Sequence, residues 1–352
     1  MKRLGSLPLE GVVLLYFIAY IPNILLTKLA TSGTHPALGR PLTGLETLPA
    51  SLLMNLAMTY VFIWLSGWHR DANAVRALGL RVPVPTRYTL LSGVGTAFIL
   101  FTVPLSFTFT NVSIPFIQLI MRGDILVIAP LVDLLFGRRV RWWSWVALVL
   151  VGIAVLLVVR QRGGFHLPPL AIATVVLYTI GYFLRLAMMT RVAKRGEEAG
   201  VRGYFVEEKM IALPLSVLAL AGISAAGFGS QAGELSWGFT AVWSDPVIWP
   251  LVGIAVTLTI VSVFAALILL DPRENTYCVP LERSSSLLAG IIAAFILHAL
   301  WGLPRPTDME LVGAALLLAA ILLLTIAPHY ARAPGARHGA LRDARDDGTT
   351  QV

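Results

Sequence analysis

The sequence predicts an all-α membrane protein, a polytopic bundle of ten transmembrane helices in two inverted five-helix repeats. Hydrophobic residues make up 57% of the chain and charged residues only 13%, whereas soluble domains carry roughly 25% charged residues. Ten apolar windows are long enough to cross a bilayer, which takes about 20 residues. Two of these windows have an arginine near their middle, and these residues, Arg122 and Arg283, lie 161 positions apart. That offset indicates a duplication.

The ten windows follow one another with polar or Gly/Pro-rich joints between them. They cover residues 10–29, 47–67, 87–107, 112–136, 142–160, 168–190, 205–227, 247–270, 276–298 and 308–327. The longest joints lie at 30–46, 68–86, 190–204 and 228–246. The chain therefore divides into a first repeat at 1–160, a second repeat at 161–330, and a tail at 331–352. The tail is rich in Arg, Asp and Gly, and we expect it to be disordered and cytoplasmic.

Basic residues predict the orientation of the bundle. With the N-terminus inside, eighteen Lys and Arg residues fall on the cytoplasmic side and five on the outer side, as the positive-inside rule requires. Both termini are then cytoplasmic. The N-terminal apolar run is longer and more polar than a secretory signal, so we expect it to stay as the first helix. The formal charge of +8 is explained by the cytoplasmic surface, and no nucleic-acid partner is expected.

Polar residues recur at equivalent places in the first and sixth windows. One helix face of the first window carries polar residues at i, i+4 and i+7, namely Tyr16, Tyr20 and Asn23. The sixth window repeats this spacing with Tyr178, Tyr182 and Arg185. Because five spans is an odd number, the second repeat must run opposite to the first. Inverted repeats commonly build a site at their interface, so we expect both faces to border one cavity.

Two windows hold ionisable residues near mid-membrane. The fourth contains Arg122 and Asp124, and the ninth contains Glu282 and Arg283. A guanidinium in hydrocarbon costs at least about 2.5–3.5 kcal/mol on insertion scales, so it normally faces a cavity or a partner. We expect both arginines to bind a ligand, and pairing with acids only to lock helices together is the alternative. Both carboxyls are candidates for proton coupling, since burial favours the neutral acid and a neighbouring arginine favours the anion.

Charged and aromatic residues near the cytoplasmic side have competing interpretations. Arg185 lies within two turns of that end and reaches either the cavity or the lipid headgroups. An interfacial ring is the favoured interpretation for three residues that open the seventh window, Glu207, Glu208 and Lys209. The alternative is that they pair with Arg185 as an inner gate. An interfacial aromatic belt is indicated by Trp142, Trp143 and Trp145.

Catalytic motifs are missing from the sequence. It has no G-x-S-x-G, H-E-x-x-H or Walker A motif. The single cysteine, Cys278, excludes an intrachain disulfide and a Cys-built metal centre, and the six histidines have no ligand spacing. We therefore expect no enzyme, no catalytic residue, no cofactor and no metal.

Five plus five spans, with proline and polar residues in the fourth, resemble the drug/metabolite transporter superfamily in its EamA-type branch. The most similar stretch runs from Asn111 to Val159 and ends in Gly152-Ile153-Ala154-Val155-Leu156-Leu157. The tenth window repeats that ending as Leu311-Val312-Gly313-Ala314-Ala315-Leu316-Leu317. Members of the family commonly have an acidic residue after the glycine that ends the fourth and ninth spans. Here Gly137 is followed by Arg138 and Gly302 by Leu303, so drug efflux does not transfer directly.

The resemblance implies a secondary transporter, proton-coupled or facilitative, that works by alternating access in a bacterial inner membrane. Its partners would be a small-molecule substrate and the lipid bilayer, and a homodimer is compatible with this architecture. The cavity is expected between spans one, three, four, six, eight and nine, with spans five and ten bracing the outside. The expected substrate-binding residues are Arg122, Arg283, Arg185, Tyr16, Tyr20, Asn23, Tyr178 and Tyr182.

The residues favour an organic anion as substrate, because the planar arginine fork suits carboxylate and phosphate groups. A neutral site for an amino acid or sugar is the alternative if Asp124 and Glu282 cancel the positive field. Tyrosine faces would also suit an exported drug-like cation. The competing class is a membrane scaffold or partner subunit that transports nothing.

Overall fold

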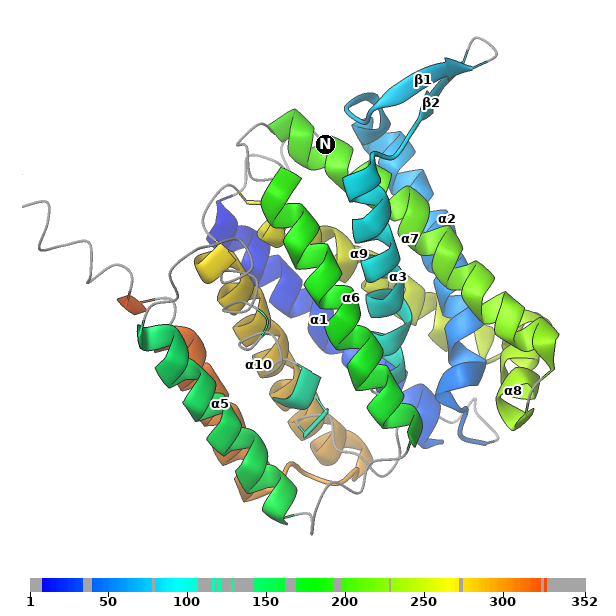
Figure 1. Cartoon of the computed structure of the whole chain (residues 1–352). Coiled ribbons are helices and arrows are strands. Elements are labelled where there is room, and N and C mark those ends of the chain that lie inside the picture. Colours follow the sequence, from blue (N-terminus) through cyan, green and yellow to red (C-terminus); the bar gives the residue numbers. More distant parts are fainter. Residues whose placement is uncertain are drawn as a thin grey trace, which may run out of the picture.

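Apolar helices dominate the computed structural model of this chain. It describes residues 8–33, 40–77, 80–106, 116–117, 119–121, 128, 142–161, 169–192, 198–227, 229–271, 275–323 and 326–327. Within these residues, seven helices are long and apolar enough to cross a membrane. They are α1 (Leu9–Ser32), α2 (Gly44–Ser66), α3 (Arg87–Ser106), α6 (Pro169–Val192), α7 (Glu198–Ala226), α9 (Ile248–Leu269) and α10 (Asn275–Trp301). The predicted multi-pass helical membrane bundle is confirmed at this level (Figure 1).

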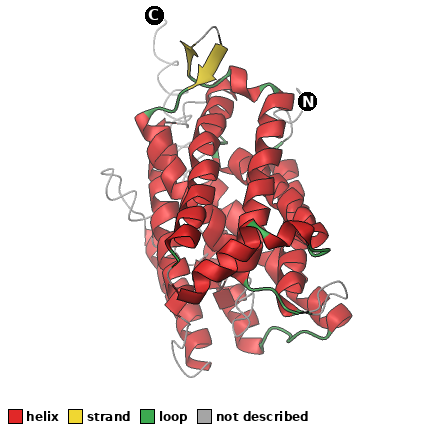
Figure 2. Ribbon diagram, turned by 90° about the vertical axis from the view of Figure 1, so that its right-hand side faces the viewer, coloured by secondary structure: helices red, strands yellow, loops and turns green. Residues whose placement is uncertain are grey.

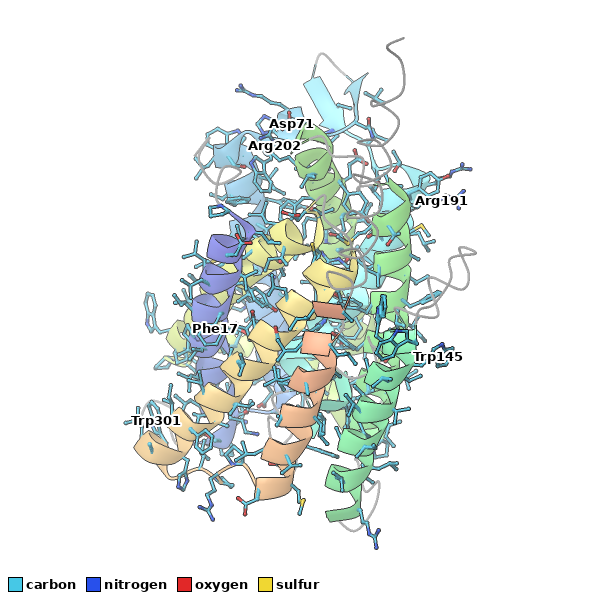
Figure 3. The ribbon with its side chains drawn as sticks, turned by 90° about the vertical axis from the view of Figure 1, so that its left-hand side faces the viewer. Phe17, Asp71, Trp145, Arg191, Arg202 and Trp301 are labelled. Atoms are coloured by element: carbon cyan, nitrogen blue, oxygen red, sulfur yellow. The ribbon has the colours of Figure 1, made fainter. Side chains whose placement is uncertain are left out.

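Two further predicted windows also form helices. These are α5 (Trp142–Gln161) and residues 308–323, and they lie side by side at one edge of the bundle (Figures 1 and 3). The fourth predicted window, 112–136, is described only at residues 116–117, 119–121 and 128. Arg122 and Asp124 therefore lie outside the described residues, as does the tail at 331–352.

A β-hairpin, which the sequence did not predict, occupies the joint between α2 and α3. Gly67 ends α2 in the left-handed conformation with φ 76°, which glycine adopts without steric cost. A short 3-10 turn, η2 (Trp68–Arg70), leads into β1 (Ala74–Ala77) and the antiparallel β2 (Leu80–Pro83). Figure 2 shows the two strands at one end of the helical bundle. The all-α prediction is therefore right for the membrane-spanning part and incomplete at this joint.

The Glu207 carboxylate on α7 holds the root of this hairpin. One of its oxygens accepts hydrogen bonds from the backbone N–H and the side-chain amide of Asn73, at 3.0 and 2.9 Å. The other accepts from the Thr89 hydroxyl on α3, at 2.9 Å. Nearby, Gly203 lies so close to the Asp71 carbonyl that a Cβ there would stand 2.4 Å from the oxygen. One buried carboxylate thus joins the hairpin, α3 and α7.

The opposite end of the bundle carries α8 (Gly229–Phe239) and the 3-10 helix η3 (Ala241–Ser244), again in a joint without predicted structure. Thr43 and Glu46 form a capping box at the start of α2, which satisfies two otherwise orphaned backbone donors. Arg40 donates two hydrogen bonds to Glu46, at 2.8 and 2.7 Å, and these bonds raise the pKa of Arg40 above its usual value. The Arg40 guanidinium also covers the Trp237 ring of α8 at 5.2 Å.

Close helix packing at the centre of the bundle depends on glycine. A Cβ added at Gly181 on α6 would stand 2.5 Å from the Gly95 carbonyl oxygen on α3, and a Cβ at Gly95 would stand 2.5 Å from the Gly181 oxygen. Small residues allow membrane helices to approach closely enough for extensive van der Waals contact. The pair therefore fixes the separation of α3 and α6.

Replacing Gly181 with alanine should force α3 and α6 apart. Overpacking of a well-packed interior costs about 1–3 kcal/mol, so we expect a clearly lower unfolding temperature in detergent. Gly222→Ala is the matched control, because a Cβ at Gly222 on α7 meets nothing within 4 Å. Equal unfolding temperatures for both variants would contradict the close crossing.

Candidate functional site

Six helices surround a cavity of about 80 Å³ inside the bundle. Its wall consists mostly of apolar residues from α3 and α9 and of polar or charged residues from α1, α6, α7 and α10. The polar and charged lining residues are Tyr16, Tyr20, Asn23, Thr96, Tyr182, Arg185, Lys209, Ser262, Glu282 and Arg283. Ligand sites in proteins combine an apolar wall with a few convergent polar groups in the same way.

Arg185 and Glu208 form a buried ion pair at this cavity. The Arg185 Nε donates to Glu208 Oε1 at 2.8 Å and its Nη2 donates to Oε2 at 3.2 Å. Their side chains are 7% and 0% exposed. A buried ion pair is tolerated only with good geometry and further hydrogen bonds to the remaining lone pairs. The two-pronged geometry meets the first of these conditions.

Glu208 receives its further hydrogen bonds from α3. The hydroxyls of Ser92 and Thr96 donate to Oε1 at 2.9 and 2.5 Å, and the Tyr204 hydroxyl donates to Ser92 Oγ at 2.7 Å. The hydrogen bonds from Ser92 and Thr96 stabilise the ionised carboxylate directly. Glu208 is therefore held as an anion that compensates Arg185.

Arg283 has a different environment, although it is 2% exposed. Its Nε lies 3.1 Å from Glu282 Oε2, an ion pair without hydrogen-bond geometry. The Tyr16 hydroxyl donates to the other oxygen of Glu282 at 2.6 Å. Sequence neighbours on a helix diverge by about 100°, but the long side chains of Glu282 and Arg283 bend toward each other.

The Arg283 guanidinium lies over two aromatic rings of α6. Its central carbon is 4.0 Å from the Tyr182 ring centroid and 5.8 Å from that of Tyr178, distances at which a cation is attracted to an aromatic face. Among the described residues, Arg283 Nε and Nη2 have no hydrogen-bond partner. Unsatisfied donors on a buried charged group are costly. An anion entering the cavity could supply the acceptors that these two nitrogens lack among the described residues.

The tyrosines and Asn23 complete the α1 side of the cavity. The ring centroids of Tyr16 and Tyr20 are 5.3 Å apart. The Asn23 amide nitrogen donates to the Ile254 carbonyl at 3.2 Å and to the Thr257 hydroxyl at 3.0 Å. Because both amide hydrogens are used in this way, Asn23 fastens α1 to α9 and offers the cavity only its oxygen.

Lys209 lines the cavity, although it was not predicted from the sequence as a substrate-binding residue. It is 2% exposed and lines the cavity from α7, with its Nζ 5.6 Å from the Phe205 ring centroid. The seventh window was expected to begin at residue 205, whereas α7 begins at Glu198. Lys209 therefore lies eleven residues along the helix, about 16 Å from its start. Its position inside a long apolar helix was the signal that would have identified it.

The structure gathers most of the predicted site residues around one cavity. Seven of them line it, namely Tyr16, Tyr20, Asn23, Tyr182, Arg185, Glu282 and Arg283, and Tyr178 packs beneath Arg283. Their functional roles stay predictions, and Arg122 and Asp124 fall outside the described residues. Two secondary interpretations were wrong. Arg185 does not reach the headgroups, and the seventh-window residues form no interfacial ring, since Glu207, Glu208 and Lys209 are all buried.

Comparisons with known proteins give the fold a precedent. No family model matches the chain, and no curated protein matches its sequence. One solved structure, described only as "Crystal structure of protein", aligns over 92% of this chain and 99% of its own, with a TM-score of 0.54 and 15% sequence identity. At that identity the likeness concerns the fold alone.

The Glu208→Ala substitution should destabilise the bundle strongly, because it leaves Arg185 buried without its counter-ion. Removing one partner of a buried pair costs about 3–5 kcal/mol. Asp71→Ala is the matched control, since the Asp71 pair with Arg202 is partly exposed (Figure 3) and pairs of that kind contribute roughly 0–1 kcal/mol. Thermal unfolding in detergent measures both, and a Glu208 variant as stable as the Asp71 variant would refute the structural role.

Proposed function

We propose that this protein is a secondary transporter of a small organic metabolite, with an organic anion as the favoured substrate. In this proposal it belongs with the EamA-type drug/metabolite transporters, in a bacterial inner membrane with both termini cytoplasmic. Two inverted repeats of five spans each open one central cavity alternately to the two sides of the membrane. Its substrate is bound where Arg283, Arg185 and the tyrosines of α1 and α6 meet.

The observation that carries this proposal is the state of Arg283. A guanidinium buried among apolar helices keeps two nitrogens without hydrogen-bond partners in the described part of the chain, and it borders a cavity. A side chain that served only to lock helices together would have those donors satisfied. Carboxylate and phosphate oxygens are the acceptors that a guanidinium binds best.

The cavity disfavours a cationic substrate. The face of Tyr182 that would attract a cation already lies 4.0 Å from the Arg283 guanidinium. A cation entering the cavity would therefore meet like charge before it reached the ring. This supports the anion over the drug-like alternative.

Helix packing supports the inverted duplication. If the halves are related by a two-fold axis, exchanging them converts the first span into the sixth and the third into the eighth. The contact of α1 with α9 then corresponds to that of α6 with α3, and the contact of α2 with α9 corresponds to that of α7 with α3. All four contacts are present. Alternating access in such proteins is largely a rocking of one repeat against the other.

A non-transporting scaffold remains the second candidate, and a specific observation favours it. Arg185 is compensated by Glu208 through two hydrogen bonds, which is what a purely structural arginine requires. The two candidates differ at Arg283, because a scaffold gives no reason for the two nitrogens that have no hydrogen-bond partner in the described part of the chain.

Reconstitution into liposomes tests the transport proposal. We expect uptake of labelled organic anions by the wild-type protein and a loss of roughly tenfold or more in Arg283→Gln, since a hydrogen bond to a charged group contributes about 1.5–3 kcal/mol. Arg305→Gln is the matched control, because Arg305 is exposed in the segment between α10 and the helix at 308–323. No uptake of any small molecule by the wild-type protein would favour the scaffold.

Proton coupling through Glu282 accompanies this proposal. The carboxylate borders the cavity between Tyr16 and Arg283, where arrival or departure of a substrate changes its surroundings. Asp124, the other candidate, lies outside the described residues.

Glu282→Gln should remove the response of uptake to an imposed pH gradient, because an amide cannot exchange the proton. Substrate exchange across the liposome membrane without a gradient should continue. Gradient-driven accumulation that is unchanged in this variant would exclude Glu282 as the coupling group.

A further inference from the structure

The charges around the cavity do not cancel. Three cations, Arg185, Lys209 and Arg283, line it. Two carboxylates face them, Glu208 on Arg185 and Glu282 on Arg283. Among the described residues, one positive charge is therefore left without a carboxylate of its own.

Geometry assigns this surplus charge to Lys209. Glu208 is its sequence neighbour, but both carboxylate oxygens of Glu208 are engaged by Arg185, and Oε1 also by two α3 hydroxyls. The Lys209 Nζ lies over the Phe205 ring, 5.6 Å from its centroid. Glu208 also attracts Lys209 electrostatically, but that carboxylate already compensates Arg185. Among the described residues, the buried ammonium therefore has no carboxylate of its own, and a further acceptor would stabilise it.

We propose that the substrate carries a single negative charge and is bound between Lys209 and Arg283, an inference that rests on the transport function proposed above. A monocarboxylate supplies the missing charge through one group. It also supplies acceptors to the two Arg283 nitrogens that have no hydrogen-bond partner among the described residues. Arg185 is a positioning residue in this arrangement, because its charge and its hydrogen bonds are committed to Glu208.

Size and charge together narrow the substrate class. The cavity of about 80 Å³ is well below the roughly 300–1,000 Å³ of pockets for drug-sized ligands, so this conformation admits only a small molecule. A dicarboxylate would bring a second charge that no described cation is free to compensate. A zwitterionic amino acid would bring an ammonium toward the surplus cation. Both are expected to bind more weakly than a monocarboxylate of the same size.

Matched carboxylates and amides test the inference directly. Acetate, propionate and butyrate are compared with acetamide, propionamide and butyramide, which have nearly the same shape and no charge. Binding to the purified full-length protein is measured by calorimetry and by ligand-induced thermal stabilisation, which reports binding to the folded state. The wild-type protein should bind at least one carboxylate roughly tenfold or more tightly than its amide.

Three variants locate the effect on Lys209. Lys209→Met removes the charge and should abolish the preference for the carboxylate, with amide binding kept or improved. Lys209→Arg keeps the charge and should keep the preference for the carboxylate over the amide. It provides a second test of the role of this charge if the Lys209→Met protein does not fold. Lys28→Met is the matched control, because Lys28 lies near the end of α1 and outside the cavity lining.

The outcomes separate this inference from the proposed function. A carboxylate preference that survives in a folded Lys209→Met protein, or that is absent from the wild type, overturns the role of Lys209. Liposome uptake of amides, zwitterions or dicarboxylates in preference to monocarboxylates overturns the monoanion while leaving a transporter. No uptake of any compound overturns both proposals.

Discussion

Ionised Glu208 in the interior of an apolar bundle is the feature on which the arrangement of three helices depends. Its carboxylate collects donors from α3 and α6 while belonging to α7. Short hydroxyl side chains, Ser92 and Thr96, reach it only because α3 lies very close to its neighbours. Glycines allow that approach, since a Cβ at Gly93 would stand 2.6 Å from Ile211 on α7. The residues that donate to Glu208 and the glycine that allows the close approach therefore lie within the same two turns of α3.

The two buried arginines differ in how completely the described residues around them satisfy their charge and hydrogen-bond donors. Arg185 has a carboxylate that matches its fork, and its burial is thereby compensated within the protein. Arg283 lies at ion-pair distance from Glu282 and over the Tyr182 ring, and two of its nitrogens have no hydrogen-bond partner among the described residues. Two arginine side chains that are both buried thus differ in how many of their hydrogen-bond donors the described residues satisfy. This difference, rather than the presence of a charge in the membrane, is the reason for proposing Arg283 as the ligand-binding group.

The apolar membrane-spanning helices could be predicted from the sequence because hydropathy and helical periodicity are local properties. The stripe of Tyr16, Tyr20 and Asn23 correctly predicted one face of α1 bordering the cavity. Lys209 was misplaced because the start of α7 was set by hydropathy, and the polar first turns of the helix at Glu198 were counted as a joint. Pairing of the seventh-window residues with Arg185 was expected from the sequence only as the alternative. The choice of Glu208 depends on packing between α6 and α7, which no local pattern encodes. The hairpin was not predicted because its strands are only four residues long. In so short a segment, alternation of apolar and polar residues is a weak signal.

Three consecutive residues of α7 serve three separate neighbours. Glu207 holds the hairpin root, Glu208 holds Arg185, and Lys209 faces the cavity. Each residue turns about 100° from the one before it. Inserting or deleting a single residue between Gly203, which is pinned against Asp71, and Glu207 would rotate all three away from their partners at once. A substitution at one of these positions is therefore expected to disturb one contact, whereas a change in the length of this stretch disturbs all three together.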